Sequence, residues 1–96
     1  MRVCFLVNPA AGRGAVGRRW PSLRTELERR RPSAEFAIAA SWEDLRRRAE
    51  AAARSGVDVV AAVGGDGTVN AVANGLVGTE TALAVVPLGT GSDYYR

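Results

Sequence analysis

The residues best suited to chemistry lie in one short stretch, from Val63 to Asn70, with the sequence VGGDGTVN. Three glycines within four positions let a backbone approach a ligand closely. An apolar run from Val57 to Val63 leads into the stretch, and a helical pattern that continues to Leu76 follows it. The free N–H groups and the positive dipole end of such a helix attract anions, so the stretch predicts a phosphate site.

Asp66 lies in the middle of this predicted anion site. A carboxylate repels a polyphosphate unless a cation or a proton transfer is involved. We therefore interpret Asp66 as catalytic, acting with magnesium at the phosphates or orienting an attacking hydroxyl. The alternative is that Asp66 is only a helix N-cap or turn residue. Thr68 and Asn70 have a similar alternative, which is to satisfy the backbone groups at the helix start.

Strand-like and helix-like segments alternate around this loop. Apolar runs predict strands at Arg2–Val7, Ala34–Ala39, Val57–Val63 and Thr81–Val86. An amphipathic stripe of apolar residues predicts a first helix over Val16–Leu27. A second helix is predicted from a capping box of Ser41 and Asp44 to a C-cap at Gly56. A third is predicted from the glycine loop to about Leu76. Pro21, inside the first stripe, predicts a kink or a helix start there. The alternation predicts an α/β fold, a three-layer α/β/α arrangement around an open, mostly parallel sheet.

Ligands of such sheets bind beyond the carboxyl ends of the strands. Three loops follow predicted strands, namely Asn8–Gly14, Gly64–Thr68 and Leu88–Ser92, and a further helix is expected to begin at Asp93. All three loops can therefore gather at one edge of the sheet. This convergence predicts a nucleotide site.

The composition narrows the class of protein. With 96 residues, 47% hydrophobic and 24% charged, the chain suits one small soluble domain. It contains no lysine, which excludes a Walker A loop, and its arginine runs at 29–31 and 46–48 suit solvated helix faces. The single cysteine, Cys4, in an apolar strand predicts a buried thiol and fits a reducing cytoplasm. Both tryptophans, Trp20 and Trp42, are expected to be packing residues. We expect no signal peptide, no membrane span and no nucleic-acid binding.

Three motifs in this order resemble the catalytic domain of the diacylglycerol kinase family, which includes bacterial lipid kinases and the sphingosine and ceramide kinases. They are the segments Asn8–Gly12, Gly64–Asn70 and Pro87–Gly91. The resemblance implies an NAD kinase/diacylglycerol kinase-like N-terminal domain over residues 1–96, and an enzyme that transfers the γ-phosphoryl group of ATP to a lipid hydroxyl. It also implies that a β-rich second lobe with the lipid pocket, the general base and the bound magnesium lies outside these residues. The 96 residues alone should then bind nucleotide weakly and turn over little or nothing.

The resemblance also implies a set of site residues, with ATP and Mg²⁺ as cofactors, Asp66 as the catalytic residue and no metal ligand assigned. The implied nucleotide contacts are Asn8, Pro9, Ala10, Ala11, Gly12, Ser41, Gly64, Gly65, Asp66, Gly67, Thr68, Val69, Asn70, Ala71 and Thr90. The alternatives are loop hydrogen bonding for Asn8, and helix capping for Ser41 and Thr90. Two positions depart from the family pattern, because Ala71 stands where glutamate is usual and Ser92 where asparagine is usual.

The implied partner is a lipid such as diacylglycerol, and the implied role is in lipid metabolism in the cytoplasm. A peripheral membrane contact and a homodimer are left open. Three other functions also remain open. An NAD kinase shares the Gly-Gly-Asp-Gly-Thr loop, a nicotinamide-dependent oxidoreductase would use the G-x-G-x-x-G pattern of Gly12–Gly17, and a non-catalytic nucleotide-binding module would suit Ala71 and Ser92.

Overall fold

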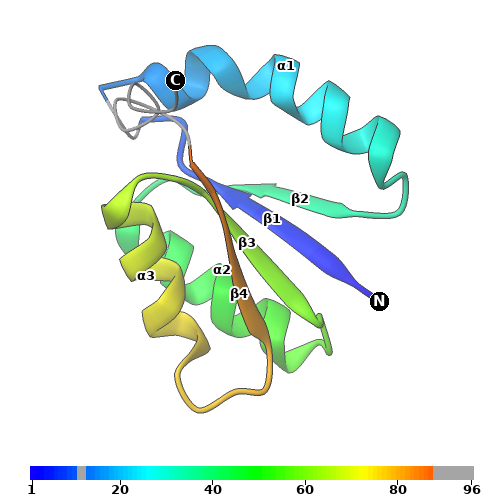
Figure 1. Cartoon of the computed structure of the whole chain (residues 1–96). Coiled ribbons are helices and arrows are strands. Elements are labelled where there is room, and N and C mark those ends of the chain that lie inside the picture. The colour runs from blue at the N-terminus through cyan, green and yellow to red at the C-terminus, as the bar shows by residue number, and fades with distance from the viewer. Residues whose placement is uncertain (11–12, 88–96) are drawn as a thin grey trace.

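The computed structural model describes residues 1–10 and 13–87, and within them strands and helices alternate as predicted (Figure 1). The elements are β1 (Val3–Val7), α1 (Ala15–Arg30), β2 (Glu35–Ile38), α2 (Trp42–Arg54), β3 (Val59–Gly64), α3 (Asp66–Leu76) and β4 (Ala82–Pro87). The four strands form one sheet in the order β2-β1-β3-β4, and every pairing is parallel. Helix α1 covers one face, while α2 and α3 cover the other. The predicted three-layer α/β/α fold is confirmed.

The two faces of the sheet carry separate apolar clusters, because alternate residues of a strand point to opposite faces. On the α1 side, Val7 and Val63 pack with Val16 and Trp20 of the predicted helical stripe. On the other side, Leu6 packs with residues of α2 and α3. The central strands β1 and β3 are therefore apolar almost throughout, as is typical of a parallel sheet covered on both faces.

Helix α1 runs continuously through Pro21, so a helix start at that residue is wrong. The helix begins at Ala15, after Gly14 in a left-handed conformation with φ 86°. A proline inside a helix removes one backbone hydrogen bond. Here Val16 and Trp20 are buried against the sheet on the turns before Pro21, and this burial offsets the lost bond.

The predicted capping box at the start of α2 is confirmed. The Asp44 amide donates to Ser41 Oγ at 3.0 Å, and Asp44 Oδ2 accepts from the amide of Ala40 at 2.9 Å. The bond from Ala40, and then the ion pair with Arg48, hold the pKa of Asp44 below its usual value. The helix ends with Ser55 as its C-cap, one position before the C-cap that the sequence predicts at Gly56, and Gly56 follows with φ 93°.

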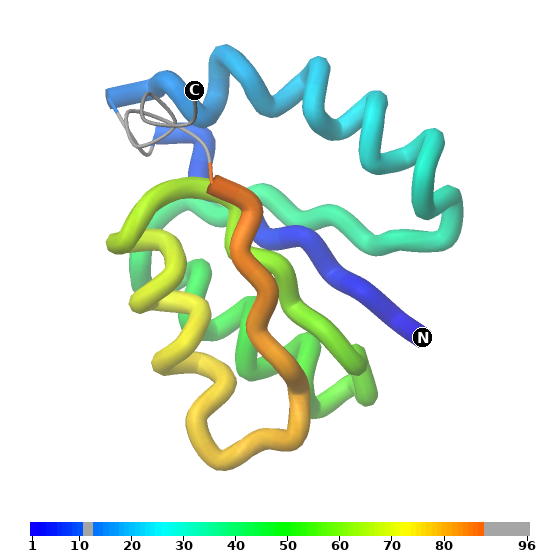
Figure 2. Tube along the Cα trace, in the orientation of Figure 1, coloured from blue at the N-terminus to red at the C-terminus, as the bar shows by residue number. Residues whose placement is uncertain are grey.

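Helices α2 and α3 lie side by side in the same layer (Figure 2). They approach each other closely at Gly75, where an added Cβ would lie 2.3 Å from the carbonyl oxygen of Arg46. A side chain at position 75 would therefore push the two helices apart.

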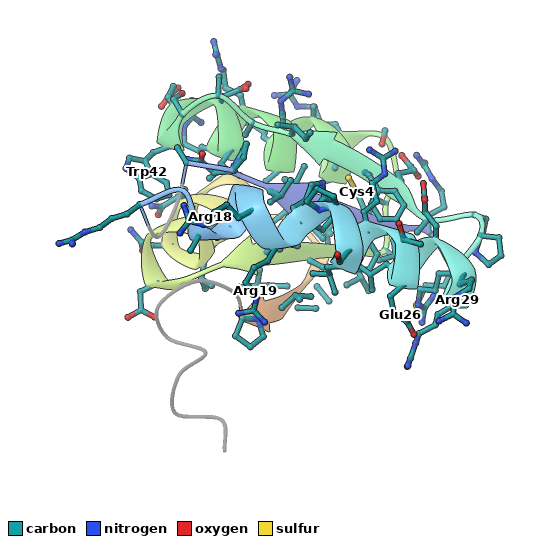
Figure 3. All side chains as sticks on the ribbon, turned by 90° about the horizontal axis from the view of Figure 1, so that it is seen from above. Cys4, Arg18, Arg19, Glu26, Arg29 and Trp42 are labelled. Carbon is teal, nitrogen blue, oxygen red and sulfur yellow. The ribbon has the colours of Figure 1, made fainter. Side chains whose placement is uncertain are left out.

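Most arginines of the helices lie on solvent-facing surfaces, as predicted (Figure 3). Arg29 and Arg30 both pair with Glu26, and Arg48 pairs with Asp44 at 3.1 Å. Cys4 is free and buried, and this burial raises its pKa. Among the described residues, no helix is both long and apolar enough to cross a bilayer.

Candidate functional site

Each helix begins at the carboxyl edge of the sheet, because all the strands run in the same direction. Val7 of β1 is level with Val63 of β3, and Gly64 is level with Pro87 of β4. The loops after β1 and β3 therefore start side by side, as predicted. The third predicted loop, Leu88–Ser92 with Thr90, and the helix expected from Asp93 lie outside the described residues, as do Ala11 and Gly12.

Gly64 makes the turn that leads from β3 into α3. Its φ of 150° lies in a region that residues with side chains rarely adopt. An added Cβ would also lie 2.6 Å from Thr68 Oγ1. A glycine is thus required here on two independent grounds. It brings the first turn of α3 back against the end of its own strand.

The N-terminus of α3 has no side-chain cap. Its N-cap is Gly65, so the alternative that Asp66 is the N-cap is wrong, and Asp66 is the first helical residue. The first hydrogen bond within the helix runs from the Val69 amide to the Gly65 carbonyl at 3.0 Å. The amides of the three preceding helical residues therefore have no partner in the helix. An added Cβ on Gly65 would meet nothing within 4 Å, so open space adjoins these amides.

The polar side chains of this loop differ in their surroundings. Thr68 is fully buried, and its Oγ1 has no hydrogen-bond partner, so the alternative that its hydroxyl satisfies the helix start is not borne out. Asp66 and Asn70 are exposed, Val69 packs partly against the core, and Ala71 is buried. Within the described parts of the chain, no group of three or more His, Cys, Asp or Glu side chains could hold a metal ion.

The loop after β1 is held by its own hydrogen bonds. Asn8 is buried, and its Oδ1 accepts from the Ala10 amide at 3.0 Å, as its structural alternative requires. The Gly14 amide donates to Ala10 O at 3.1 Å, and the Gly17 amide donates to Pro9 O at 2.9 Å. Gly14 and Gly17 of the G-x-G-x-x-G pattern thus take part in closing the loop against α1.

The start of α2 faces the start of α3. Ser41 is confirmed as the N-cap of α2. Next to it, Trp42 is 51% exposed and packs only in part, against Gly67, whereas Trp20 is buried as predicted. The Trp42 indole lies at the edge over Gly67, where an added Cβ would be 2.9 Å from its Cη2 and 3.1 Å from its Cζ2. Trp42 is the first residue of α2 and lies at the edge of the sheet, so its ring does not pack on the sheet's face.

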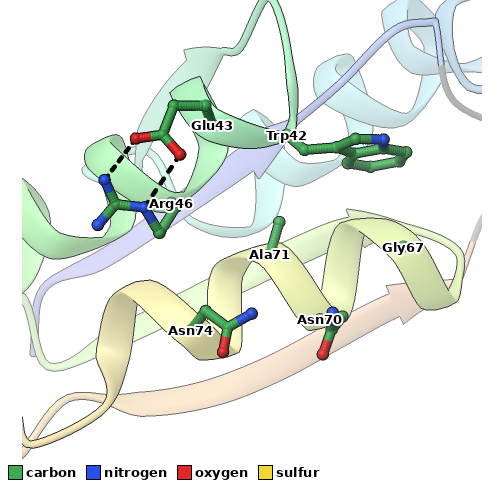
Figure 4. A pocket seen from close by; sticks show the side chains of 7 residues that line it. All are labelled: Trp42, Glu43, Arg46, Gly67, Asn70, Ala71 and Asn74. Atoms are coloured by element: carbon green, nitrogen blue, oxygen red, sulfur yellow. Dashed lines mark hydrogen bonds and ion pairs between the residues drawn. The ribbon is translucent and has the colours of Figure 1, made fainter.

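A groove with a cavity volume of about 380 Å³ opens between α2 and α3 beside this contact. It is lined by Trp42, Glu43, Arg46, Gly67, Asn70, Ala71 and Asn74 (Figure 4). The α3 residues up to Ala71 belong to the predicted site, whereas Asn74 and the three residues of α2 were missed. Two signals were present in the sequence. Trp42 directly follows the cap Ser41 at the predicted edge, and Asn74 is four residues after Asn70, hence on the same helix face.

The chain is similar to known proteins along its whole length. The family model described as Diacylglycerol kinase catalytic domain matches residues 2–96. The diacylglycerol kinase of Mycobacterium tuberculosis (strain H37Rv) is 33% identical over 95 residues, which cover 99% of this chain and 31% of that protein. The diacylglycerol kinase of Staphylococcus haemolyticus is 32% identical over 100 residues, covering 100% and 30% respectively. The chain thus spans about a third of the length of the curated relatives it matches.

Solved structures agree with these matches. A crystal structure described as a diacylglycerol kinase from Bacillus anthracis str. Sterne has a TM-score of 0.77 and 31% identity, with 99% of this chain and 35% of that chain covered. The solution structure of a phosphate-loop protein has a TM-score of 0.68 and 26% identity, with 91% and 78% covered. Both similarities extend over nearly all of the sheet and its helices.

Proposed function

The chain belongs to the diacylglycerol kinase catalytic domain family, and on that premise we propose that it is the ATP-binding part of a lipid kinase. The proposed enzyme transfers the γ-phosphoryl group of ATP to the hydroxyl of a lipid such as diacylglycerol. Family membership favours this function over an NAD kinase and over a nicotinamide-dependent oxidoreductase. Because the relatives are about three times as long, the acceptor site is proposed to need residues beyond these 96.

The observation that carries the proposal is the open N-terminus of α3. It combines amides without helical partners, no side-chain cap, and open space beside Gly65. A helix start with these properties binds anions through its N–H groups and its dipole. Phosphates of ATP would accept hydrogen bonds from the backbone of Gly65, Gly67 and Thr68.

The residues present fit a magnesium–nucleotide complex in part. Mg²⁺ is usually held by one or two carboxylates together with substrate phosphates, and it neutralises charge on the transferring group. Asp66 supplies one exposed carboxylate at the start of α3. Its part is to orient the cation at the phosphates, whose positions the backbone amides fix.

Titration calorimetry with ATP, with and without Mg²⁺, tests this proposal. We expect the chain to bind ATP more tightly when Mg²⁺ is present, and Asp66→Asn to remove most of that gain. Glu80→Gln is the matched control, because Glu80 is an exposed carboxylate between α3 and β4, at the opposite edge of the sheet. Failure of the wild-type chain to bind ATP under either condition would contradict the proposal.

A second candidate is a nucleotide-binding module without catalysis. The observation that favours it is Ala71, a buried residue without a polar group where the family usually has glutamate. In that case ATP binding would be independent of Mg²⁺ and unchanged by Asp66→Asn, so the same titrations separate the two candidates. Under the kinase proposal, the 96 residues alone should transfer little or no radiolabelled phosphate to diacylglycerol vesicles. Ready phosphorylation by this chain would overturn the division into two parts.

A further inference from the structure

We propose that the groove between α2 and α3 holds the nucleoside half of the nucleotide, with Trp42 as the wall on which the base stacks. This inference rests on the proposed function, because it takes the phosphates to lie at the N-terminus of α3. It adds a binding role for a residue of α2 that is not part of the glycine loop. It also accounts for a large aromatic ring left half exposed.

Trp42 is suited to stacking because its position is fixed and its ring is accessible. The indole lies against Gly67, with Cη2 2.9 Å from the position an added Cβ would take. Half of the residue nevertheless remains exposed, at the mouth of the groove (Figure 4). Stacking of a base on an aromatic side chain is a general means of binding nucleotides with little sequence preference.

Asn70 and Asn74 provide hydrogen-bonding groups on the opposite wall. Both are exposed, and both side chains line the groove from the same face of α3. Among residues 1–10 and 13–87, neither amide group has a hydrogen-bond partner. Each amide carries both donors and an acceptor, which matches the mixed edges of a base and the hydroxyls of a ribose.

The charge of the groove favours a neutral ligand over a phosphate. Its only cation among the described lining residues, Arg46, is bonded to Glu43 at 3.2 and 2.5 Å and lies 3.6 Å from Glu50. The arginine is thus neutralised by two carboxylates. A phosphate placed beside them would be repelled, whereas an uncharged base and ribose would not.

The length of the groove suits a ligand that begins at the glycine loop. Its lining residues on α3 run from Gly67 to Asn74, a rise of about 10 Å along a helix. Beyond Asn74 the groove is closed, because Gly75 is in contact with the backbone of Arg46. A nucleotide with its phosphates at Gly65–Thr68 would therefore extend its nucleoside into a site that ends where the two helices meet.

Three probes, ATP, adenosine and inorganic tripolyphosphate, test the inference by titration against the wild-type chain and Trp42→Leu. Leucine keeps an apolar side chain and removes the stacking surface. We expect Trp42→Leu to weaken ATP and adenosine binding about tenfold, and to leave tripolyphosphate binding unchanged. The matched control is Trp20→Phe, which changes the buried tryptophan, keeps all affinities and leaves Trp42 as the only tryptophan. In that variant adenosine should quench the fluorescence of Trp42.

The outcomes separate this inference from the proposed function. If tripolyphosphate and ATP bind but ATP affinity is the same in Trp42→Leu, the groove is not the nucleoside site and the proposed function stands. If adenosine binds and tripolyphosphate does not, the groove is supported and the phosphate site is wrong. Equal losses for ATP and tripolyphosphate would show that Trp42 only supports the loop, and would overturn the inference. Binding of none of the three probes would overturn both.

Discussion

The loops after β1 and β3 occupy equivalent places in the fold, and both lead into a helix with a glycine N-cap, yet their backbone amides are bonded differently. The first is closed over the residues that the structure describes, because the amides of Ala10, Gly14 and Gly17 all donate to acceptors within the loop. The second is open, because the α3 amides after Gly65 precede the first helical bond and no side chain caps them. Even the buried hydroxyl of Thr68 in the open loop lacks a partner.

The difference supports the proposal that the loop after β3 is the one that binds a ligand. A folded protein satisfies nearly all of its backbone N–H groups, so a loop that leaves several of them open at an exposed edge has not been completed by its own chain. Self-bonding gives the closed loop its shape without a ligand. The open loop keeps its shape through the turn at Gly64 and the packing of Thr68 beneath it.

The largest effect should come from changing Gly64, on which the open loop depends. Gly64→Ala combines an unfavourable φ of 150° with a contact of 2.6 Å to Thr68 Oγ1. We expect a loss of about 3 kcal/mol in the free energy of unfolding. Urea unfolding measures this loss. A variant as stable as the wild type would show that the loop can be built without glycine.

A smaller loss is expected in the closed loop from Gly17→Ala. An added Cβ would lie 2.8 Å from the carbonyl oxygen of Pro9 and would push α1 away from the loop. Alanine has a higher helix propensity than glycine, which offsets up to about 1 kcal/mol of this cost. The net loss in the free energy of unfolding should therefore be about 1 to 2 kcal/mol. Nucleotide affinity, corrected for the folded fraction, should not change. A selective loss of ATP binding in this variant would weaken the contrast between the loops.

The opposite sign is expected for Thr68→Val in the absence of ligand. The buried hydroxyl has no partner, so replacing it with a methyl group should raise the free energy of unfolding by about 1 kcal/mol or leave it unchanged. Thermal unfolding with and without ATP measures both states. A clear destabilisation of the free protein would mean that the hydroxyl is already satisfied.

The smallest effect on stability is expected from Asp44→Asn, which tests the contrast between the capped start of α2 and the uncapped start of α3. The amide of Ala40, and then Arg48, lower the pKa of Asp44, so its contribution to stability is present above the ordinary carboxyl pKa. That contribution is lost as the pH falls through the lowered pKa. Asp44→Asn should therefore lose less stability than the wild type between about pH 4 and pH 2. Unfolding curves of the wild type and of Asp44→Asn across this pH range measure the difference, and Asp66→Asn is the control from the loop after β3. An equal loss of stability with acid in the wild type and in Asp44→Asn would mean that the Asp44 cap contributes nothing.

Most of the fold could be predicted from the sequence because its signals are local and agree with one another. The apolar runs gave all four strands, and the pairing of Ser41 with Asp44 gave the start of α2. The glycine loop followed from its spacing between a strand and a helix. The helix start predicted as one possibility at Pro21 was wrong, because burial of Val16 and Trp20 outweighs the local penalty of the proline.

The groove could not be predicted, because it depends on how two helices pack. Trp42 and Asn74 are 32 positions apart, and they line one groove because α2 packs against α3, with close contacts at Gly67 and Gly75. A tryptophan is most often buried, and the position of Trp42 directly after the cap Ser41 is a weak local signal beside that tendency. The distinction arises at the edge of the sheet, which is a property of the whole fold.

The central claim is that the open start of α3 receives the phosphates of a nucleotide. Gly65→Val tests it most directly, because the space beside Gly65 is empty and its backbone is extended, with φ −105° and ψ −159°. A valine there should lower the free energy of unfolding of the free protein by no more than about 1 kcal/mol, the cost of a poorer N-cap, while covering the amides. We predict at least about a tenfold weaker binding of both ATP and tripolyphosphate by calorimetry. Unchanged affinity for both ligands in a fully folded Gly65→Val chain would contradict the claim.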